Sequence, residues 1–316
     1  MDSDTKKYVF GPVPSRRLGR SLGVDLVPFK TCTFNCVYCQ LGCTPATTIE
    51  RKEWVPVEPV LEQILEKISG DSKPDYITFS GSGEPTLHSG IGEIIKQIKE
   101  MTDIPVAVLT NGSLLWKPEV RQSLLEADLV VPSLDAGDEQ LYQYVNRPDP
   151  AISFEKLVEG LVQFRKEYTG KLWLEVFLLG GVTGIESEVR KLADIVRQIK
   201  PDRVHLNTVA RPPAENFAFA VAKEKLKRFA DIFEGDVEIA GEETPIHEYS
   251  DLSAHQDDIL TMLERRPCTI EDISRGLGMH QTEVIKYVDR LVEENRVSER
   301  RQNGIIYYAV VTDRPG

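Results

Sequence analysis

The residues with the clearest chemistry in this chain are four of its five cysteines, which lie within twelve positions. Cys32, Cys36 and Cys39 have the spacing C-x3-C-x2-C, and Cys43 adds a fourth thiol. A structural zinc site would use all four thiolates, but usually as two separated C-x2-C pairs. A second interpretation is that the cysteines are buried and bind nothing, but four cysteines within twelve residues make this a poor explanation. An iron–sulfur cluster is the third interpretation, in which three thiolates bind three irons and one iron stays open to a substrate or cofactor.

The composition favours a cytoplasmic protein that binds a metal or performs catalysis over a nucleic-acid-binding protein. A bunch of cysteines without a disulfide framework indicates metal binding or catalysis in a reducing compartment. Residues 1–7 are polar, no apolar signal region follows them, and no run of about 18 uncharged apolar residues occurs, so we expect a cytoplasmic protein. The net charge of −12 argues against a protein whose main affinity is for a polyphosphate backbone.

The elements that must position these cysteines alternate between strand and helix patterns from about residue 22 to residue 240, as in repeated βα units. We expect strands at 21–29, 75–80, 104–110, 128–134, 171–179 and 202–209. Their nearly continuous apolar runs indicate burial on both faces. Six units are too few for a closed eight-unit barrel, which leaves a partial barrel or an open parallel sheet. In either fold, chemistry concentrates at the carboxyl ends of the strands.

Unusual residues do follow the expected strands. The cysteines come after the first strand, "GSGEPT" (81–86) after the second, "NGS" (111–113) after the third and "DAGDE" (135–139) after the fourth. Asn-Gly is also a common turn dipeptide, so Asn111 is equally well explained as a turn residue. Because parallel strands end at one edge, we expect these segments to form one site.

C-x3-C-x2-C after the first strand, with Tyr38 directly before the last cysteine, resembles the radical S-adenosylmethionine (radical SAM) superfamily. The resemblance implies a partial (β/α)6 TIM-like barrel in which Cys32, Cys36 and Cys39 hold a [4Fe-4S] cluster. It implies that S-adenosylmethionine chelates the open iron and is cleaved reductively to a 5′-deoxyadenosyl radical, which abstracts hydrogen from a substrate. It also implies an external one-electron reductant of the flavodoxin or ferredoxin type.

Other strand ends agree with this resemblance. Ser82-Gly83-Glu84-Pro85 is similar to the Gly-Gly-Glu-Pro motif that contacts the methionine amino group, with Ser in place of the first Gly. "TNG" and "SLDA" look like the family's polar contacts to the ribose and methionine portions. The implied cofactor-binding residues are Tyr38, Gly81, Ser82, Gly83, Glu84, Asn111, Ser133 and Asp135. Residues 178–184 match the adenine motif only loosely, so adenine contacts are not assigned.

The same motifs resemble the subgroup of wyosine-synthase-like Fe-S oxidoreductases. The second N-terminal cysteine set of the wyosine-synthesising enzyme is absent from residues 1–31, so its reaction is not transferred to this chain. Cys43 is expected to be a bystander beside the cluster; the less favoured alternative is a fourth ligand, which would block the open iron. Cys268 is expected to pack as a small apolar residue.

Arginines suggest the kind of substrate. Arg16, Arg17 and Arg20 precede the first expected strand, and Arg211 follows the sixth. Planar guanidinium groups suit a carboxylate or phosphate, although a solvated basic loop explains the first three equally well. If they share the barrel mouth, they favour an anionic substrate; an RNA base, a protein side chain and an anionic metabolite stay open. His205 is expected to be a satisfied core histidine.

The C-terminal part changes character. We assign residues 1–240 to the barrel, 241–252 to an acidic linker and 253–316 to a winged helix-turn-helix domain. Helical patterns at 255–266, 269–278 and 281–296 precede an Asn303-Gly304 hairpin signal.

This domain contains nine Lys and Arg against eleven Asp and Glu, so it lacks the basic face of a DNA reader. We therefore favour a docking role or a lid over the barrel. The alternative function is an Fe-S redox-sensing, DNA-binding regulator. Such a regulator would need a basic face for DNA, and it would not need an ordered set of polar residues at the strand ends.

Overall fold

The computed structural model describes residues 7–15, 17–70, 73–240, 256–277, 279, 281–302 and 304–311. It is an α/β fold built on one eight-stranded sheet in which the strands follow chain order from β1 to β8. The strands of this sheet are β1 (Val9–Ser15), β2 (Gly19–Val24), β3 (Tyr76–Phe79), β4 (Val106–Thr110), β5 (Leu129–Pro132), β6 (Lys171–Leu178), β7 (Arg203–Thr208) and β8 (Val237–Ile239). Strands β2 to β8 run parallel, and β1 pairs antiparallel with β2.

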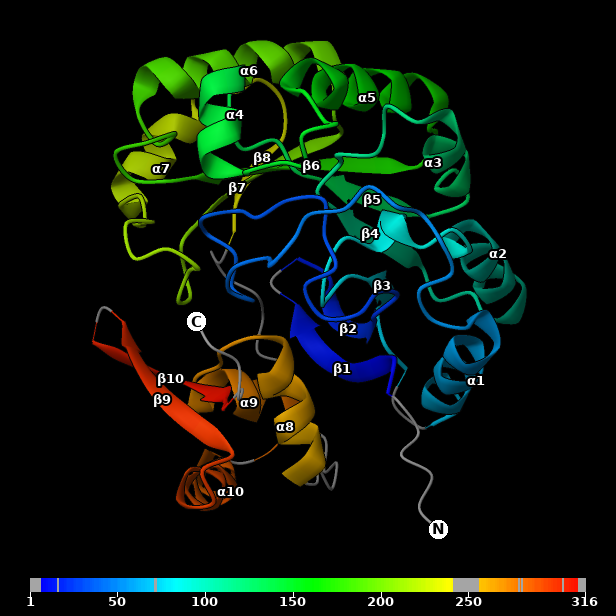
Figure 1. Cartoon of the computed structure of the whole chain (residues 1–316), viewed down its shortest axis with the longest axis vertical. Coiled ribbons are helices and arrows are strands. Elements are labelled where there is room, and N and C mark those ends of the chain that lie inside the picture. The colour runs from blue at the N-terminus through cyan, green and yellow to red at the C-terminus, as the bar shows by residue number, and fades with distance from the viewer. Residues whose placement is uncertain are drawn as a thin grey trace.

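Helices cover the outer, convex face of the curved sheet (Figure 1). They are α1 (Val57–Ile68), α2 (Ile91–Met101), α3 (Pro118–Ser123), α4 (Glu139–Val145), α5 (Phe154–Glu167), α6 (Glu186–Ile199) and α7 (Lys223–Ala230). The short 3-10 turn η1 (Pro85–Leu87) follows the loop after β3. In α1 the buried residues are Val60, Leu61, Ile64 and Ile68, one apolar stripe of helical period. The predicted partial TIM-like barrel is confirmed, and all six expected strands are present.

The two faces of the sheet bury different residues. On β4, Val106 and Val108 pack in the large core beneath the helices, whereas Ala107 belongs to a smaller cluster with Leu129 and Val131. Since successive side chains of a strand point to opposite faces, the second cluster lies on the inner face of the arc. Burial on both faces explains why these strands read as continuous apolar runs.

Two strands of the sheet were not predicted. β1 contains Gly11, Pro12 and Pro14, and such residues indicate a loop; the strand lies at the edge of the sheet, where proline is tolerated. β8 has only three residues, all half-buried, which is too short for a periodic pattern. Both additions sit at the edges, so they leave the predicted central strands unchanged.

The C-terminal segment contains the three helices and the hairpin that the sequence predicts. They are α8 (Gln256–Arg265), α9 (Ile270–Leu277), α10 (Gln281–Glu293), β9 (Val297–Gln302) and β10 (Ile305–Val310). Thr269 opens α9 through a reciprocal cap, because its Oγ1 accepts from the Asp272 N–H at 3.0 Å and Asp272 Oδ2 accepts from the Thr269 N–H at 3.1 Å. Cys268 is fully buried in the core of this segment, as expected.

Helices α8 and α9 lie beside β1 (Figure 1). The assignment of a winged helix-turn-helix domain to residues 253–316 stays a prediction, and the expected linker at 241–252 falls outside the described residues. None of the described helices combines the length and apolar character that crossing a bilayer would require.

Candidate functional site

The cysteine loop follows β2, and side chains from different parts of the chain donate to three of its thiols. Cys32 Sγ accepts from Asn111 Nδ2 at 3.6 Å, and Cys36 Sγ accepts from Asn146 Nδ2 at 3.5 Å. Cys39 Sγ accepts from Lys30 Nζ at 3.3 Å. These three cysteines are half-buried, whereas Cys43 is exposed. The structure therefore separates the predicted ligand triad from the fourth cysteine.

Within the described part of the chain, no three His, Cys, Asp or Glu side chains are grouped as a site for one metal ion. Burial raises the pKa of Cys32 to about 12, and it raises the pKa of Cys36 well above its ordinary value. Metal binding would therefore have to displace protons from these thiols.

Asp135 holds the cysteine loop against the ends of β5 and β6. It is 2% exposed, and its Oδ2 accepts from the Tyr38 hydroxyl and from Asn146 Nδ2. Its Oδ1 accepts from the Phe177 N–H at 3.2 Å. The Tyr38 ring stacks on Phe177, with centroids 4.0 Å apart. Burial raises the pKa of Asp135, while the hydrogen bond from Tyr38 opposes that shift. Tyr38 and Asp135 were predicted from separate motifs, and the structure joins them by a hydrogen bond.

Glu84 joins the loops that follow β3 and β4. It is 2% exposed, and its Oε1 accepts from the Thr86 N–H, the Thr86 hydroxyl and the Thr110 hydroxyl at 3.0, 2.6 and 2.6 Å. Its Oε2 accepts from the Asn111 N–H at 2.7 Å. Burial raises the pKa of Glu84, and these hydrogen bonds oppose the shift. Its carboxylate thus shapes two neighbouring loops; contact with a cofactor ammonium stays a prediction.

The glycines of the 81–84 segment are required by close packing. Gly81 has φ +119°, and a Cβ there would lie 1.9 Å from Asp25 Oδ1. A Cβ on Gly83 would lie 2.0 Å from the Thr31 carbonyl oxygen. Ser82 is not among the residues with positive φ, so a side chain is tolerated where the family motif has its first Gly. Its carbonyl accepts from the Lys30 N–H at 2.6 Å, which joins this segment to the cysteine loop.

The remaining predicted residues lie at the same edge of the sheet. Asn111 follows β4 and donates through Nδ2 to Thr33 Oγ1 at 2.7 Å as well as to Cys32. Ser133 follows β5, is half-buried and forms an isolated bridge with Glu175 on β6. The structure therefore brings all the predicted cofactor residues to the carboxyl ends of β2 to β5.

Comparison with known proteins decides the family. The family model described as the Radical SAM superfamily matches residues 26–196, which include the cysteine loop and the 81–84 segment. The chain belongs to the radical SAM superfamily.

The similarity to individual proteins extends beyond residues 26–196, the region that the family model matches. This radical SAM protein is 40% identical over 310 residues to a protein named GTPase Obg from Brachyspira hyodysenteriae; the match covers 96% of this chain and 45% of that protein. It is 33% identical to a UPF0026 protein of Methanocaldococcus jannaschii, with 95% and 94% of the two chains covered. A radical SAM methyltransferase structure from Sphaerobacter thermophilus has a TM-score of 0.53 at 16% identity and covers 69% of this chain and 65% of its own. That structural likeness shows the fold.

Members of the superfamily use a [4Fe-4S] cluster and S-adenosylmethionine. The donor set of this radical SAM protein fits such a cluster, since thiolates are the protein ligands that [4Fe-4S] clusters take. Each of the three thiols already accepts a hydrogen bond, and hydrogen bonds to the sulfurs tune the reduction potential of such clusters.

Lys30, Thr33 and Asn146 were missed by the sequence analysis. Asn146 follows α4 and is 110 positions from Cys36, so no local pattern links the two. Lys30 is 7% exposed, and its ammonium also donates to the Gly42 carbonyl oxygen. The signal available in the sequence was the position of Lys30, two residues before the first cysteine.

Lys30→Met should make the reduction potential of the cluster more negative, by on the order of 100 mV, because it removes a positive charge next to the Cys39 thiolate. The measurement is a redox titration followed by electron paramagnetic resonance. Lys52→Met is the matched control, since Lys52 pairs with exposed Glu50. Equal potentials in the Lys30 variant and the native protein would contradict the expectation.

Two of the predicted substrate arginines, Arg17 and Arg211, are engaged by carboxylates. Arg17 pairs through Nη1 with Glu175 Oε2. Arg211 is 7% exposed and pairs through Nη2 with Asp272 of α9 at 3.3 Å. Arg16 lies outside the described residues. The structure does not present Arg17 and Arg211 as one anion clamp, because each already balances a different acid; substrate contact by either residue stays a prediction.

His205 is fully buried, as predicted, but it is not satisfied. Neither ring nitrogen has a hydrogen-bond partner among the described residues, and the ring lies 5.1 Å from that of Trp173. Burial, together with the charges of Arg17 and Arg203, lowers the pKa of His205 to about 4. The expectation of a satisfied core histidine is therefore wrong in its hydrogen bonding.

This histidine should make folding sensitive to acid. Its pKa is lower in the folded state than in the unfolded state, so its contribution to stability is present above about pH 6.5 and is lost as the pH falls toward 4. Between pH 7 and pH 5 the loss should be about 2 kcal/mol. Urea unfolding of the native protein and His205→Leu at both pH values measures it. The variant should lose about 2 kcal/mol less than the native protein; equal losses would contradict the assignment.

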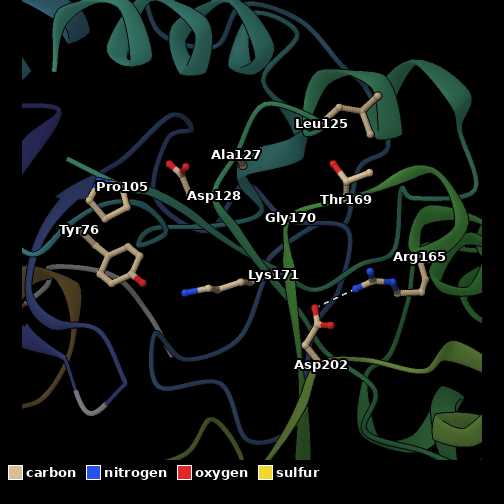
Figure 2. Close-up of a pocket in the computed structure, with 10 residues that line it drawn as sticks. All are labelled: Tyr76, Pro105, Leu125, Ala127, Asp128, Arg165, Thr169, Gly170, Lys171 and Asp202. Atoms are coloured by element: carbon tan, nitrogen blue, oxygen red, sulfur yellow. Dashed lines mark hydrogen bonds and ion pairs between the residues drawn. The ribbon is translucent and has the colours of Figure 1, made fainter. Parts of the chain in front are cut away.

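A separate pocket lies at the opposite ends of the strands (Figure 2). Tyr76 and Lys171 are the first residues of β3 and β6, and Asp128 and Asp202 directly precede β5 and β7. Asp128 accepts from a backbone N–H of β4, and Asp202 accepts from one of β6 and pairs with Arg165 at 2.8 Å. These acids tie the starts of neighbouring strands together and so contribute to the stability of the barrel.

Proposed function

We propose that this radical SAM protein cleaves S-adenosylmethionine reductively at a [4Fe-4S] cluster held by Cys32, Cys36 and Cys39. When bound, the two cofactors would supply a 5′-deoxyadenosyl radical for hydrogen abstraction from a substrate at the barrel mouth. The carrying observation is the division of the four cysteines: three thiols each accept from a different side chain, and the exposed Cys43 is outside that set. Such a triad leaves one corner of a cubane without a protein thiolate.

The residues around the triad orient and shield the site. Asp135 and Glu84 are almost completely buried. Glu84 ties together the loops after β3 and β4, and Asp135 ties the cysteine loop to the ends of β5 and β6. Such loops, held by buried hydrogen bonds, preorganise a site before its cofactor binds. Superfamily enzymes generally need an external electron donor; we propose a flavodoxin or ferredoxin here.

The test is anaerobic reconstitution followed by dithionite and S-adenosylmethionine. The expected products are 5′-deoxyadenosine and methionine. A change in the spectrum of the reduced cluster on adding S-adenosylmethionine should accompany them. A labelled DNA fragment shifted by the holoprotein, with no nucleoside product, would instead favour the iron–sulfur regulator.

The substrate class is a finer proposal. The resemblance to wyosine-synthase-like enzymes makes an RNA base one candidate, beside a protein side chain and an anionic metabolite. Mass spectrometry of RNA nucleosides, proteins and small metabolites from cells with and without this gene distinguishes them. A difference confined to modified nucleosides would support the RNA base.

A further inference from the structure

The C-terminal helices meet the barrel at Asp25, the residue directly after β2. Arg265, at the end of α8, donates through Nε to Asp25 Oδ2 at 3.0 Å. Its guanidinium also lies over the ring of Phe10 on β1, 3.8 Å from the centroid. The Arg265 and Asp25 side chains are 11% and 10% exposed. This ion pair, which joins residues 240 positions apart, is therefore largely shielded from solvent.

Asp25 has a second partner in the segment that resembles the methionine-binding motif. Its Oδ1 accepts from the Ser82 N–H at 2.7 Å, and it fills the space that a Cβ on Gly81 would need. One carboxylate thus holds Arg265 through one oxygen and the 81–84 segment through the other. Burial raises the pKa of Asp25, and the charge of Arg265 opposes that shift. Without the guanidinium, the buried carboxylate would lack its compensating charge.

Two more contacts hold the C-terminal domain at the same edge of the sheet. Asp272 of α9 pairs with Arg211 at 3.3 Å, and the Tyr307 hydroxyl of β10 donates to the Ala210 carbonyl oxygen at 2.8 Å. Ala210 and Arg211 follow β7, whereas Asp25 follows β2. The domain therefore contacts loops at the carboxyl ends of two strands that are far apart in the sheet order.

We propose that Arg265 is a positioning residue for S-adenosylmethionine. Through Asp25, the docked C-terminal domain orients the Ser82 backbone, and with it the segment that contacts the methionine amino group. The inference rests on the proposed function, because it takes the 81–84 segment as part of the cofactor site. Since coupling between two binding events is reciprocal, S-adenosylmethionine should in turn strengthen docking of the domain.

The test compares Arg265→Met, Arg265→Lys and the control Arg275→Met, whose native arginine pairs with exposed Glu271 inside α9. Reconstituted full-length proteins of equal iron content are titrated with S-adenosylmethionine, and the spectrum of the reduced cluster is followed. Arg265→Met should raise the half-saturating concentration about tenfold. Arg265→Lys, which keeps the charge, should stay within about twofold of native, as should the control. In the cleavage assay KM for S-adenosylmethionine should rise while kcat is retained.

Hydrogen exchange of the apoprotein gives an independent measurement. The Ser82 amide should exchange about tenfold faster in Arg265→Met than in native protein and Arg275→Met. Unchanged half-saturation, or an equal increase in Arg275→Met, would overturn the proposal, and so would unchanged Ser82 exchange. If the native cluster gave no spectral response to S-adenosylmethionine, the proposed function would fail, while Ser82 exchange would still decide the link through Asp25.

Discussion

Cys36→Ala should abolish both the iron–sulfur cluster and the production of 5′-deoxyadenosine, whereas Cys43→Ala should retain both. Cys36 lies in the half-buried triad and accepts from Asn146, while Cys43 is exposed. Loss of one of three thiolates removes a direct ligand, so the effect should exceed the 10- to 100-fold losses typical of residues that only support ligands. We expect the rate of cleavage to fall by more than about 100-fold.

The measurement combines iron and sulfide analysis, the visible spectrum and quantification of 5′-deoxyadenosine after dithionite reduction. The two cysteine variants control for each other, because both remove one thiol from the same loop. Loss of the cluster in Cys43→Ala would show that the fourth cysteine is a ligand. The proposed open iron would then be wrong.

Glu84→Ala should destabilise the apoprotein by about 4 kcal/mol, because it leaves several buried donors without their acceptor. These donors are the N–H groups of Thr86 and Asn111 and the hydroxyls of Thr86 and Thr110. The same change should weaken binding of S-adenosylmethionine, since it loosens the loops after β3 and β4.

Urea unfolding followed by circular dichroism measures the first effect, and the spectral titration of the reduced cluster measures the second. Glu93→Ala is the matched control, because Glu93 accepts from Gln97 on the exposed face of α2. The control should lose less than about 0.5 kcal/mol. A Glu84 variant as stable as the control would contradict the role assigned to this carboxylate.

Much of the fold follows from local patterns. The central strands are buried on both faces, so their apolar runs are visible in sequence. The α9 cap was also predictable, since Thr269 and Asp272 are only three positions apart. β1 was not, because its prolines indicate a loop and only its position at the sheet edge makes them acceptable.

The arginines show where such patterns fail. Arg17 and Arg211 have the chemistry of anion binding, but each is paired with an acid from a distant element, Glu175 and Asp272. Charge type can be read from sequence, whereas the partner of a charge depends on which elements pack together. His205 fails similarly, because its burial follows from the strand pattern but its hydrogen bonding does not.

By itself, the sequence determined the C-x3-C-x2-C spacing, the six central strands and the polar residues that follow them, because these depend on spacing along a few neighbouring positions. Only the tertiary structure decided that Asn146 contacts Cys36 and that Arg265 contacts Asp25. Those pairs are 110 and 240 positions apart. Contacts over such separations arise from how the sheet curves and how the C-terminal helices pack against it, and no local pattern of residues carries that information.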